Sequence, residues 1–170
     1  MTKKMAEGTV AILGGRGMLG TDLAKVCREE GFGTEVFDLP EFDITNDEQL
    51  KEVLDKSKII VNCAAFTNVD GAESEAELAY QINAEAVGRL GVLTKEADVK
   101  LIHISTDFVF DGRLNRPYLE TDSANPINTY GQTKLAGERL LAQSGCNHCI
   151  IRVQWTYGSG GNNFVTKLVQ

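Results

Sequence analysis

The chain has 170 residues, of which 42% are hydrophobic and 24% are charged, as in an ordinary folded protein. One domain of about 100–200 residues accounts for this length, and such a domain needs neither disulfides nor a metal to fold. Its 24 acidic and 17 basic residues leave a net charge of −7, which repels phosphate backbones and argues against nucleic acid as a partner.

No apolar stretch approaches the roughly 20 residues of a membrane-spanning helix. The start of the chain, before Gly8, contains no apolar segment of signal-peptide length. We therefore expect a cytoplasmic protein with no membrane partner, whose four cysteines are reduced thiols. Cys146 and Cys149 form a CxxC without a second ligand pair, so we expect no metal site there.

Short apolar runs alternate along the chain with stretches in which apolar residues recur at helical spacing. In chain order, this pattern predicts a strand at 9–13, a helix at 19–30, a strand at 35–38, a helix at 47–56, a strand at 58–62, a long helix at 73–97, a strand at 100–105, a loop at 106–126, a helix at 130–143, a strand at 149–153 and the opening of a helix at 164–170. This alternation predicts an α/β fold, namely a Rossmann-like doubly wound parallel sheet with helices on both faces. Such a sheet binds ligands beyond the carboxyl ends of its strands.

Three glycines follow the first predicted strand and open the first predicted helix. Gly14, Gly17 and Gly20 have the spacing of a turn whose backbone N–H groups meet a pyrophosphate. Asp38 ends the second predicted strand, where a carboxylate accepts hydrogen bonds from a ribose 2′-hydroxyl and disfavours a 2′-phosphate. Arg16, inside the turn, would instead attract a 2′-phosphate. The pattern predicts a dinucleotide site and leaves NADPH, NADH or both open.

A second group of residues predicts proton transfer at the same edge of the sheet. Tyr130 and Lys134 are four residues apart on a predicted helix, so they share one face. A free phenol has a pKa of about 10, and a nearby ammonium lowers that pKa toward the neutral range. Thr106 follows the fourth predicted strand, where it can orient a substrate carbonyl. We expect Tyr130 to donate a proton to that carbonyl oxygen while a nicotinamide supplies hydride.

With these motifs, the chain resembles the extended short-chain dehydrogenase/reductase family and, more narrowly, its dTDP-4-dehydrorhamnose reductase branch. The matching stretches run through nearly the whole chain, at 14–20, 43–45, 62–70, 72–75, 82–85, 103–112, 125–138 and 161–164. The resemblance implies NAD(P)H-dependent reduction of the C4 ketone of dTDP-4-dehydro-L-rhamnose to dTDP-L-rhamnose. It also implies that Thr106, Tyr130 and Lys134 are the catalytic residues.

The resemblance further implies which residues contact the ligands. Contacts with the cofactor are expected at Gly14, Arg16, Gly17, Met18, Leu19, Gly20, Asp38, Asp43, Ile44, Ala64, Ala65, Thr67, Tyr130 and Lys134. Contacts with the nucleotide-sugar substrate are expected at Val69, Thr106, Phe108 and Trp155. Family members often form homodimers, and some use Mg²⁺, for which this chain offers no ligand set that we can assign. Asn83 either braces the backbone near the site or faces solvent, whereas His103 is expected in the core.

Family members are longer than this chain, and their C-terminal part closes over the nucleotide sugar. We therefore expect residues 1–170 to form one NAD(P)-binding Rossmann domain that carries the catalytic residues, without that substrate-closing part. The stretch at 152–158 keeps the family's tryptophan, Trp155, but departs from the family pattern at three other positions. The exact sugar therefore stays open.

Other activities are less well matched. A 4,6-dehydratase of this superfamily would need a glutamate after Asp107, where this chain has Phe108, a side chain that cannot move protons. Two alternatives stay open. One is another extended short-chain dehydrogenase/reductase that acts on a nucleotide sugar. The other is a non-catalytic NAD(P)-binding regulatory subunit that resembles the methionine adenosyltransferase β subunit.

Overall fold

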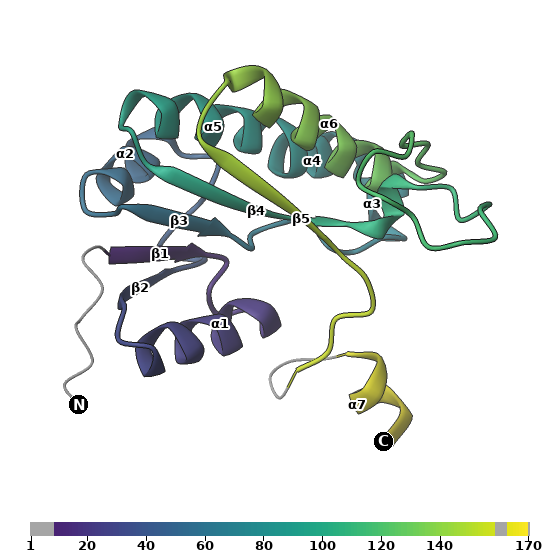
Figure 1. The fold of residues 1–170 in the computed structure, drawn as a ribbon, viewed down its shortest axis with the longest axis horizontal. Helices are drawn as coiled ribbons and strands as arrows, with labels where there is room; N and C mark the ends of the chain where they lie inside the picture. The colour runs from purple at the N-terminus through teal and green to yellow at the C-terminus, as the bar shows by residue number, and fades with distance from the viewer. Residues whose placement is uncertain (1–8, 159–162, 170) are drawn as a thin grey trace.

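A parallel five-stranded sheet forms the centre of the computed structural model, which describes residues 9–158 and 163–169 (Figure 1). Residues 161–162 of the family resemblance lie outside these described residues. The strands are β1 (Thr9–Leu13), β2 (Gly33–Phe37), β3 (Ile59–Asn62), β4 (Lys100–Thr106) and β5 (His148–Val153), in the order β2-β1-β3-β4-β5. The predicted Rossmann-like sheet is confirmed. Its strand order reverses between β1 and β3, and sheets of this kind bind ligands at such a switch point.

Helices cover both faces of the sheet (Figure 1). α1 (Met18–Glu29) lies below β1 and β2, whereas α2 (Asp47–Leu54), α5 (Ala86–Glu96) and α6 (Thr129–Ser144) lie on the other face. α7 (Phe164–Val169), on the α1 side, was predicted as the opening of a helix. None of the helices in the described part of the chain is long and apolar enough to cross a membrane.

Each central strand contributes to two separate cores, because alternate side chains point to opposite faces. Ala11 and Leu13 belong to the larger cluster beneath α2, α5 and α6, whereas Val10 and Ile12 belong to a smaller cluster against α1. This arrangement explains why β1 is apolar at every position. Coverage thins toward β5, where Ile151 on the α1 face is 43% exposed.

The long helix predicted at 73–97 is divided in the structure, so that prediction was wrong in its continuity. It consists of α3 (Gly71–Ser74), α4 (Ala76–Tyr80), the π-helical turn η1 (Gln81–Glu85) and α5. A π turn places one extra residue in the helical repeat, which shifts the side chains that follow it. Both Asn83 and Ala84 are fully buried as a result. Apolar spacing gives no signal for this turn, because its inward residue is an asparagine whose partners lie elsewhere in the chain.

α6 packs closely against η1 and against the end of β4. Its N-terminus is capped by Asn128, whose side chain accepts a hydrogen bond from the backbone N–H of Gly131, and it ends at Gly145 with φ +67°. A Cβ at Gly137 would overlap the carbonyl oxygen of Asn83, and a Cβ at Gly131 would overlap that of Phe108. These two glycines therefore fix how near α6 approaches η1 and the turn that follows β4.

Gly137→Ala tests this close approach. The added methyl group must push α6 away from η1, so we expect a loss of about 1–3 kcal/mol in the free energy of unfolding. Thermal denaturation should show a Tm lowered by roughly 3–10 °C. The control is Gln143→Ala, an exposed position on the same helix that should change stability by less than about 0.5 kcal/mol. Equal Tm values for the two variants would contradict the packing.

Candidate active site

The glycine turn joins β1 to α1 at the switch point of the sheet. Gly14 has φ +69°, and a Cβ there would lie 2.6 Å from the backbone nitrogen of Ala64. A Cβ at Gly20 would lie 2.5 Å from the carbonyl oxygen of Gly14. Gly17 differs, because it is exposed and its nearest neighbour in the fold, the Gly14 oxygen, would be 3.3 Å away. The protein's own packing requires Gly14 and Gly20, whereas Gly17 leaves bare backbone at the start of α1, where a phosphate can approach.

Asp38 connects the end of β2 to this turn. Its carboxylate accepts hydrogen bonds from the backbone N–H groups of Arg16, at 2.8 Å, and of Leu39, at 2.9 Å. The Arg16 guanidinium donates to the Leu39 carbonyl oxygen at 3.0 Å and to the Glu41 carboxylate at 2.6 Å, which lowers the pKa of Glu41. The sequence had predicted both Asp38 and Arg16 beside the cofactor, and the structure brings them together at the glycine turn. It gave no sign of Glu41, which lies 25 residues from Arg16.

The other predicted cofactor residues lie in several environments. Ala64 and Ala65 follow β3, and Ala64 faces Gly14 across the switch point. Asp43 is exposed and accepts hydrogen bonds from the backbone and the hydroxyl of Thr45. Ile44 belongs to the larger core, so only its backbone is available to a ligand. Met18 and Leu19, in the first turn of α1, and Val69 are half-buried, whereas Thr67 is exposed; for these four the ligand role stays a prediction.

Asn83 braces the segment that follows β3, which settles the alternative left open by the sequence. Its side-chain oxygen accepts from the Phe66 N–H at 2.9 Å, and its amide donates to the Phe66 carbonyl at 3.1 Å. The same amide donates to the hydroxyl of Thr133 on α6 at 3.2 Å. One buried side chain thus links the segment after β3 to the helix that carries Tyr130 and Lys134.

A contact between the start of α6 and α3 reinforces this link. Both the backbone N–H and the hydroxyl of Thr129 donate to the Glu73 carboxylate at 2.8 Å, which lowers the pKa of Glu73. Glu73 lies on the short helix α3. It is exposed, but it holds the residue that precedes Tyr130.

Thr106 and Tyr130 meet at the carboxyl end of β4. Thr106 is only 5% exposed, and its hydroxyl accepts the backbone N–H of Phe108 at 3.2 Å. The Phe108 ring packs edge-on against the Tyr130 ring, with centroids 5.6 Å apart. Burial and the nearby Asp107 raise the pKa of Tyr130, while a side-chain hydrogen bond with Thr106 opposes this rise. Tyr130 is therefore a protonated phenol at neutral pH.

Lys134 is buried beneath Thr106 and Tyr130. It does not lower the pKa of Tyr130, although the sequence had predicted that it would. Its Nζ donates to the carbonyl oxygen of Ile104 at 2.8 Å and lies 3.4 Å from Nε2 of His103. Burial lowers the pKa of Lys134 to about 8, against the opposing effects of Glu138 and Cys63. The expected lowering of the Tyr130 pKa by Lys134 was wrong, because Lys134 is not among the groups that shift this pKa, and burial raises it.

A buried ion pair holds α6 against β4 and β5. The hydroxyl of Ser105 donates to Glu138 at 2.5 Å, and Arg152 binds the same carboxylate through Nε at 3.0 Å and Nη2 at 2.6 Å. The Arg152 guanidinium also lies over the ring of Phe110, 4.9 Å from its centroid. The sequence reasoning missed this group. The available signal was an arginine inside an otherwise apolar strand, since a charge in that position needs a partner.

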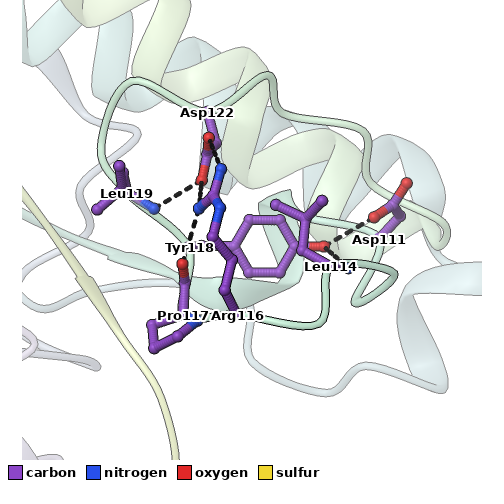
Figure 2. A network of polar contacts seen from close by, with 7 residues as sticks. All are labelled: Asp111, Leu114, Arg116, Pro117, Tyr118, Leu119 and Asp122. Carbon is purple, nitrogen blue, oxygen red and sulfur yellow. Dashed lines mark hydrogen bonds and ion pairs between the residues drawn. The ribbon is translucent and has the colours of Figure 1, made fainter.

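The loop after β4 borders a cleft of about 1000 Å³ whose lining includes Phe108 and Arg152. Figure 2 shows the two contacts that shape this loop: the hydroxyl of Tyr118 points at Asp111, and the Arg116 guanidinium faces Asp122. The first distance is 2.8 Å, and the second contact consists of two bonds of 2.7 Å. Hydrogen bonds from the Asn125 side chain, the Arg113 N–H and Tyr118 lower the pKa of Asp111 to about 2. The Arg116 side chain and the Leu119 N–H lower the pKa of Asp122 to about 2. Contacts within the segment predicted as a loop therefore hold it beside Phe108.

Trp155 lies beyond the carboxyl end of β5. It is 67% exposed, with φ +51°, a conformation that is strained for an aromatic residue. Its substrate contact stays a prediction. Within the described residues, no three or more His, Cys, Asp and Glu side chains are grouped so that they could hold a metal ion.

Comparisons with known proteins show which family the chain resembles over nearly its whole length. A family model described as "RmlD substrate binding domain" matches residues 8–170. A dTDP-4-dehydrorhamnose reductase of Aggregatibacter actinomycetemcomitans is 39% identical over 162 residues, which cover 94% of this chain and 55% of that protein. A dTDP-4-keto-6-deoxy-D-glucose reductase of Streptomyces niveus is 37% identical over 165 residues, covering 94% and 56%. The chain thus spans about half the length of the curated relatives it matches.

A solved structure shows the same fold. The dTDP-4-dehydrorhamnose reductase of Bacillus anthracis str. Ames, in complex with NADP, superposes with a TM-score of 0.92 at 38% identity. The match covers 96% of this chain and 59% of that one.

The lowered pKa of Lys134 predicts a specific dependence of stability on pH. The unfolded chain keeps this proton up to a pH of about 10.4, whereas the folded chain releases it near pH 8. Between these values the unfolded state binds more protons, so Lys134 should contribute a rise of about 2 kcal/mol in the free energy of unfolding from pH 7.5 to 10. Lys134→Met should remove this rise, as measured by urea denaturation of parent and variant at both pH values.

Lys51→Met, at an exposed position on α2, is the matched control and should keep the pH dependence of the parent. If Lys134→Met and the parent gained equally between pH 7.5 and 10, Lys134 would titrate as an ordinary lysine.

Proposed function

This chain belongs to the family described as the RmlD substrate binding domain, and we propose that it reduces the C4 ketone of dTDP-4-dehydro-L-rhamnose to dTDP-L-rhamnose with NADPH or NADH. The observation that carries this proposal is the pairing of Thr106 and Tyr130 at the same sheet edge as the glycine turn. In a parallel sheet all carboxyl ends lie at one edge, so a ligand bound across the switch point reaches both groups.

The residues present fit a nicotinamide dinucleotide. Gly17 leaves the N-terminus of α1 open to a pyrophosphate, and Asp38 lies at the end of β2, where it can meet a ribose. Ala64 and Ala65 place only small side chains between this corner and β4. A reduced nicotinamide bound there supplies the hydride, and the chain supplies the proton and the positioning.

Proton delivery depends on the hydrogen bond of the Thr106 hydroxyl and on the protonation of the Tyr130 phenol. In the structure the Thr106 hydroxyl donates to the Asp107 carboxylate at 3.2 Å, and on substrate binding it turns to donate to the ketone oxygen of the sugar. As negative charge develops on that oxygen, the Tyr130 phenol transfers its proton to it. The raised pKa of Tyr130 keeps this proton in place at neutral pH before the reaction. The Phe108 ring, packed on Tyr130, shields one side of the phenol from water.

The names of the relatives support the proposed sugar, and Phe108 is the proposed substrate residue that also lines the cleft. Phe108, Val69 and Trp155 are proposed to contact it, with Phe108 at the border between the Tyr130 ring and the cleft. The names of the relatives include both a rhamnose-series and a glucose-series 4-keto-6-deoxy reductase. Both names describe reduction of a ketone at the same carbon, which supports the reaction type more strongly than the sugar configuration.

We also propose that the protein acts in the cytoplasm. Cys27, Cys63, Cys146 and Cys149 are free thiols, which suits a reducing compartment. A homodimer remains a prediction from the family resemblance, and sedimentation equilibrium would measure it.

Tyr130→Phe tests the proton donor. Loss of the hydroxyl should lower turnover at least about 100-fold, because general acid catalysis contributes that much or more. The Kd for NADPH, measured by fluorescence titration, should change by less than about twofold, since the ring stays in place. Turnover is followed as NADPH oxidation with enzymatically generated dTDP-4-dehydro-L-rhamnose.

Tyr80→Phe, at a tyrosine that is 43% exposed on α4, is the matched control and should keep the activity of the parent. Parent-like turnover by Tyr130→Phe would refute the role of Tyr130 as the acid. NADPH binding by a parent chain without turnover would favour the non-catalytic alternative, or a requirement for the additional length of the relatives.

Glu41→Gln tests how the chain chooses between NADPH and NADH. In the structure the Arg16 guanidinium is occupied by Glu41, so the variant frees it for a 2′-phosphate. We expect affinity for NADPH to rise about 2–5-fold relative to NADH, in keeping with an exposed ion pair. Titration with both cofactors measures the ratio, and Glu48→Gln on α2 is the control. An equal change in affinity for NADPH and NADH would show that Arg16 does not bind the 2′-phosphate.

A further inference from the structure

Three polar side chains form a continuous buried line beneath the catalytic edge. Asn62 on β3 and His103 on β4 are neighbours in the sheet, and both are 0% exposed, while Lys134 on α6 is 2% exposed. The Asn62 amide nitrogen lies 3.2 Å from Nδ1 of His103, and Nε2 of the same ring lies 3.4 Å from Nζ of Lys134. The proton transfer proposed above assigns no step to any of these three residues.

The orientation of the Asn62 amide is fixed from outside this line. Its side-chain oxygen accepts the backbone N–H of Ala64 at 3.0 Å, so the oxygen must face Ala64 and the NH₂ group must face His103. An amide NH₂ group donates hydrogen bonds and does not accept them. Nδ1 of His103 must therefore be the acceptor, and the neutral imidazole must carry its proton on Nε2.

This tautomer determines what His103 offers to Lys134. The Nε2–H points at Nζ, and only an atom with a lone pair can accept it. A neutral amine has one lone pair, whereas an ammonium has none. With Lys134 neutral, its lone pair accepts the Nε2–H and one of its own hydrogens binds the Ile104 carbonyl. With Lys134 charged, two donors face each other inside the protein.

We propose that Asn62 and His103 are positioning residues that oppose protonation of Lys134, because the tautomer imposed by Asn62 presents a donor that only the neutral amine can accept. The consequence for catalysis rests on the proposed function: with a pKa of about 8, Lys134 loses its charge just above neutral pH. The tautomer itself does not depend on any reaction.

The charged groups around Lys134 act in both directions. Glu138 on α6 and the Cys63 thiol after β3 favour the ammonium. Glu138 is already bound by Arg152 and Ser105, and burial raises the pKa of Cys63 to about 11, so this thiol is neutral at pH 7. Burial lowers the pKa of Lys134 to about 8, and burial together with Lys134 keeps His103 from becoming protonated.

The tautomer can be measured directly by long-range ¹H–¹⁵N correlation NMR on the full chain labelled in histidine. The chain has two histidines, and His148→Gln assigns the spectrum. His148 is also an internal reference, because its Nδ1 lies 2.9 Å from the Cys146 carbonyl and must carry a proton. We expect His103 to show the Nε2–H tautomer, unprotonated from about pH 5.5 to 8.5. An Nδ1–H tautomer, or protonation of His103 near its ordinary pKa of about 6.5, would overturn the proposal.

Asn62→Asp tests whether the tautomer controls Lys134. A carboxylate still accepts from Ala64 but now also accepts from His103, so the proton should move to Nδ1 and leave Nε2 as an acceptor for an ammonium. The titration midpoint of Lys134, followed by ¹³Cε NMR and assigned with Lys134→Met, should rise by about one unit or more. Asn115→Asp, at an exposed loop position, controls for the added charge and should shift neither signal.

If Asn62→Asp moved the His103 proton to Nδ1 but left the titration midpoint of Lys134 unchanged, the proposed effect of the tautomer on Lys134 would be overturned. If Asn62→Asp does not fold, the tautomer of the parent decides the proposal alone. Neither measurement uses substrate or cofactor, so a failure here is distinct from a failure of the proposed reduction.

Discussion

The burial of Lys134 under the carboxyl end of β4 is the constraint on which the rest of the site depends. A lysine that is 2% exposed needs a fixed acceptor, and the Ile104 carbonyl, 2.8 Å away, is that acceptor. The contact requires α6 to lie close to the end of β4, and Gly131 and Gly137 allow α6 to pack against the turn after β4 and against η1. Tyr130, one turn earlier on the same helix, is then brought to Thr106. Packing, rather than a direct contact between Tyr130 and Lys134, builds the reacting pair.

The cofactor side of the site has its own organising contact. The Asp38 carboxylate accepts the Arg16 N–H, which fixes the glycine turn to the end of β2. Gly14 lies against Ala64, so the ends of β1, β2 and β3 converge at the switch point. Asn83 then connects the segment after β3 to α6, and through it the cofactor side to the proton donor. Two regions far apart in sequence thus share one rigid frame.

Buried polar groups, not apolar packing, distinguish the catalytic edge from the rest of the fold. Asn62, His103, Lys134 and Glu138 all lie in the interior, where an unpaired polar group is costly. Each is paired, and among the described side chains no buried nitrogen or oxygen lacks a hydrogen-bond partner. Such a fully satisfied network specifies one arrangement of its members, which is what a site that positions hydroxyl groups requires.

The sequence by itself determined the order of strands and helices, the parallel sheet and the glycine turn. It also identified Thr106, Tyr130 and Lys134 as candidate catalytic residues. These features follow from local periodicity and fixed spacing, which the chain displays directly. Only the tertiary structure decided the π turn at Asn83, the pairing of Arg16 with Glu41, and the protonation of Tyr130 and Lys134. Those outcomes depend on burial and on partners distant in the chain, such as Phe66 for Asn83, and no local pattern encodes them.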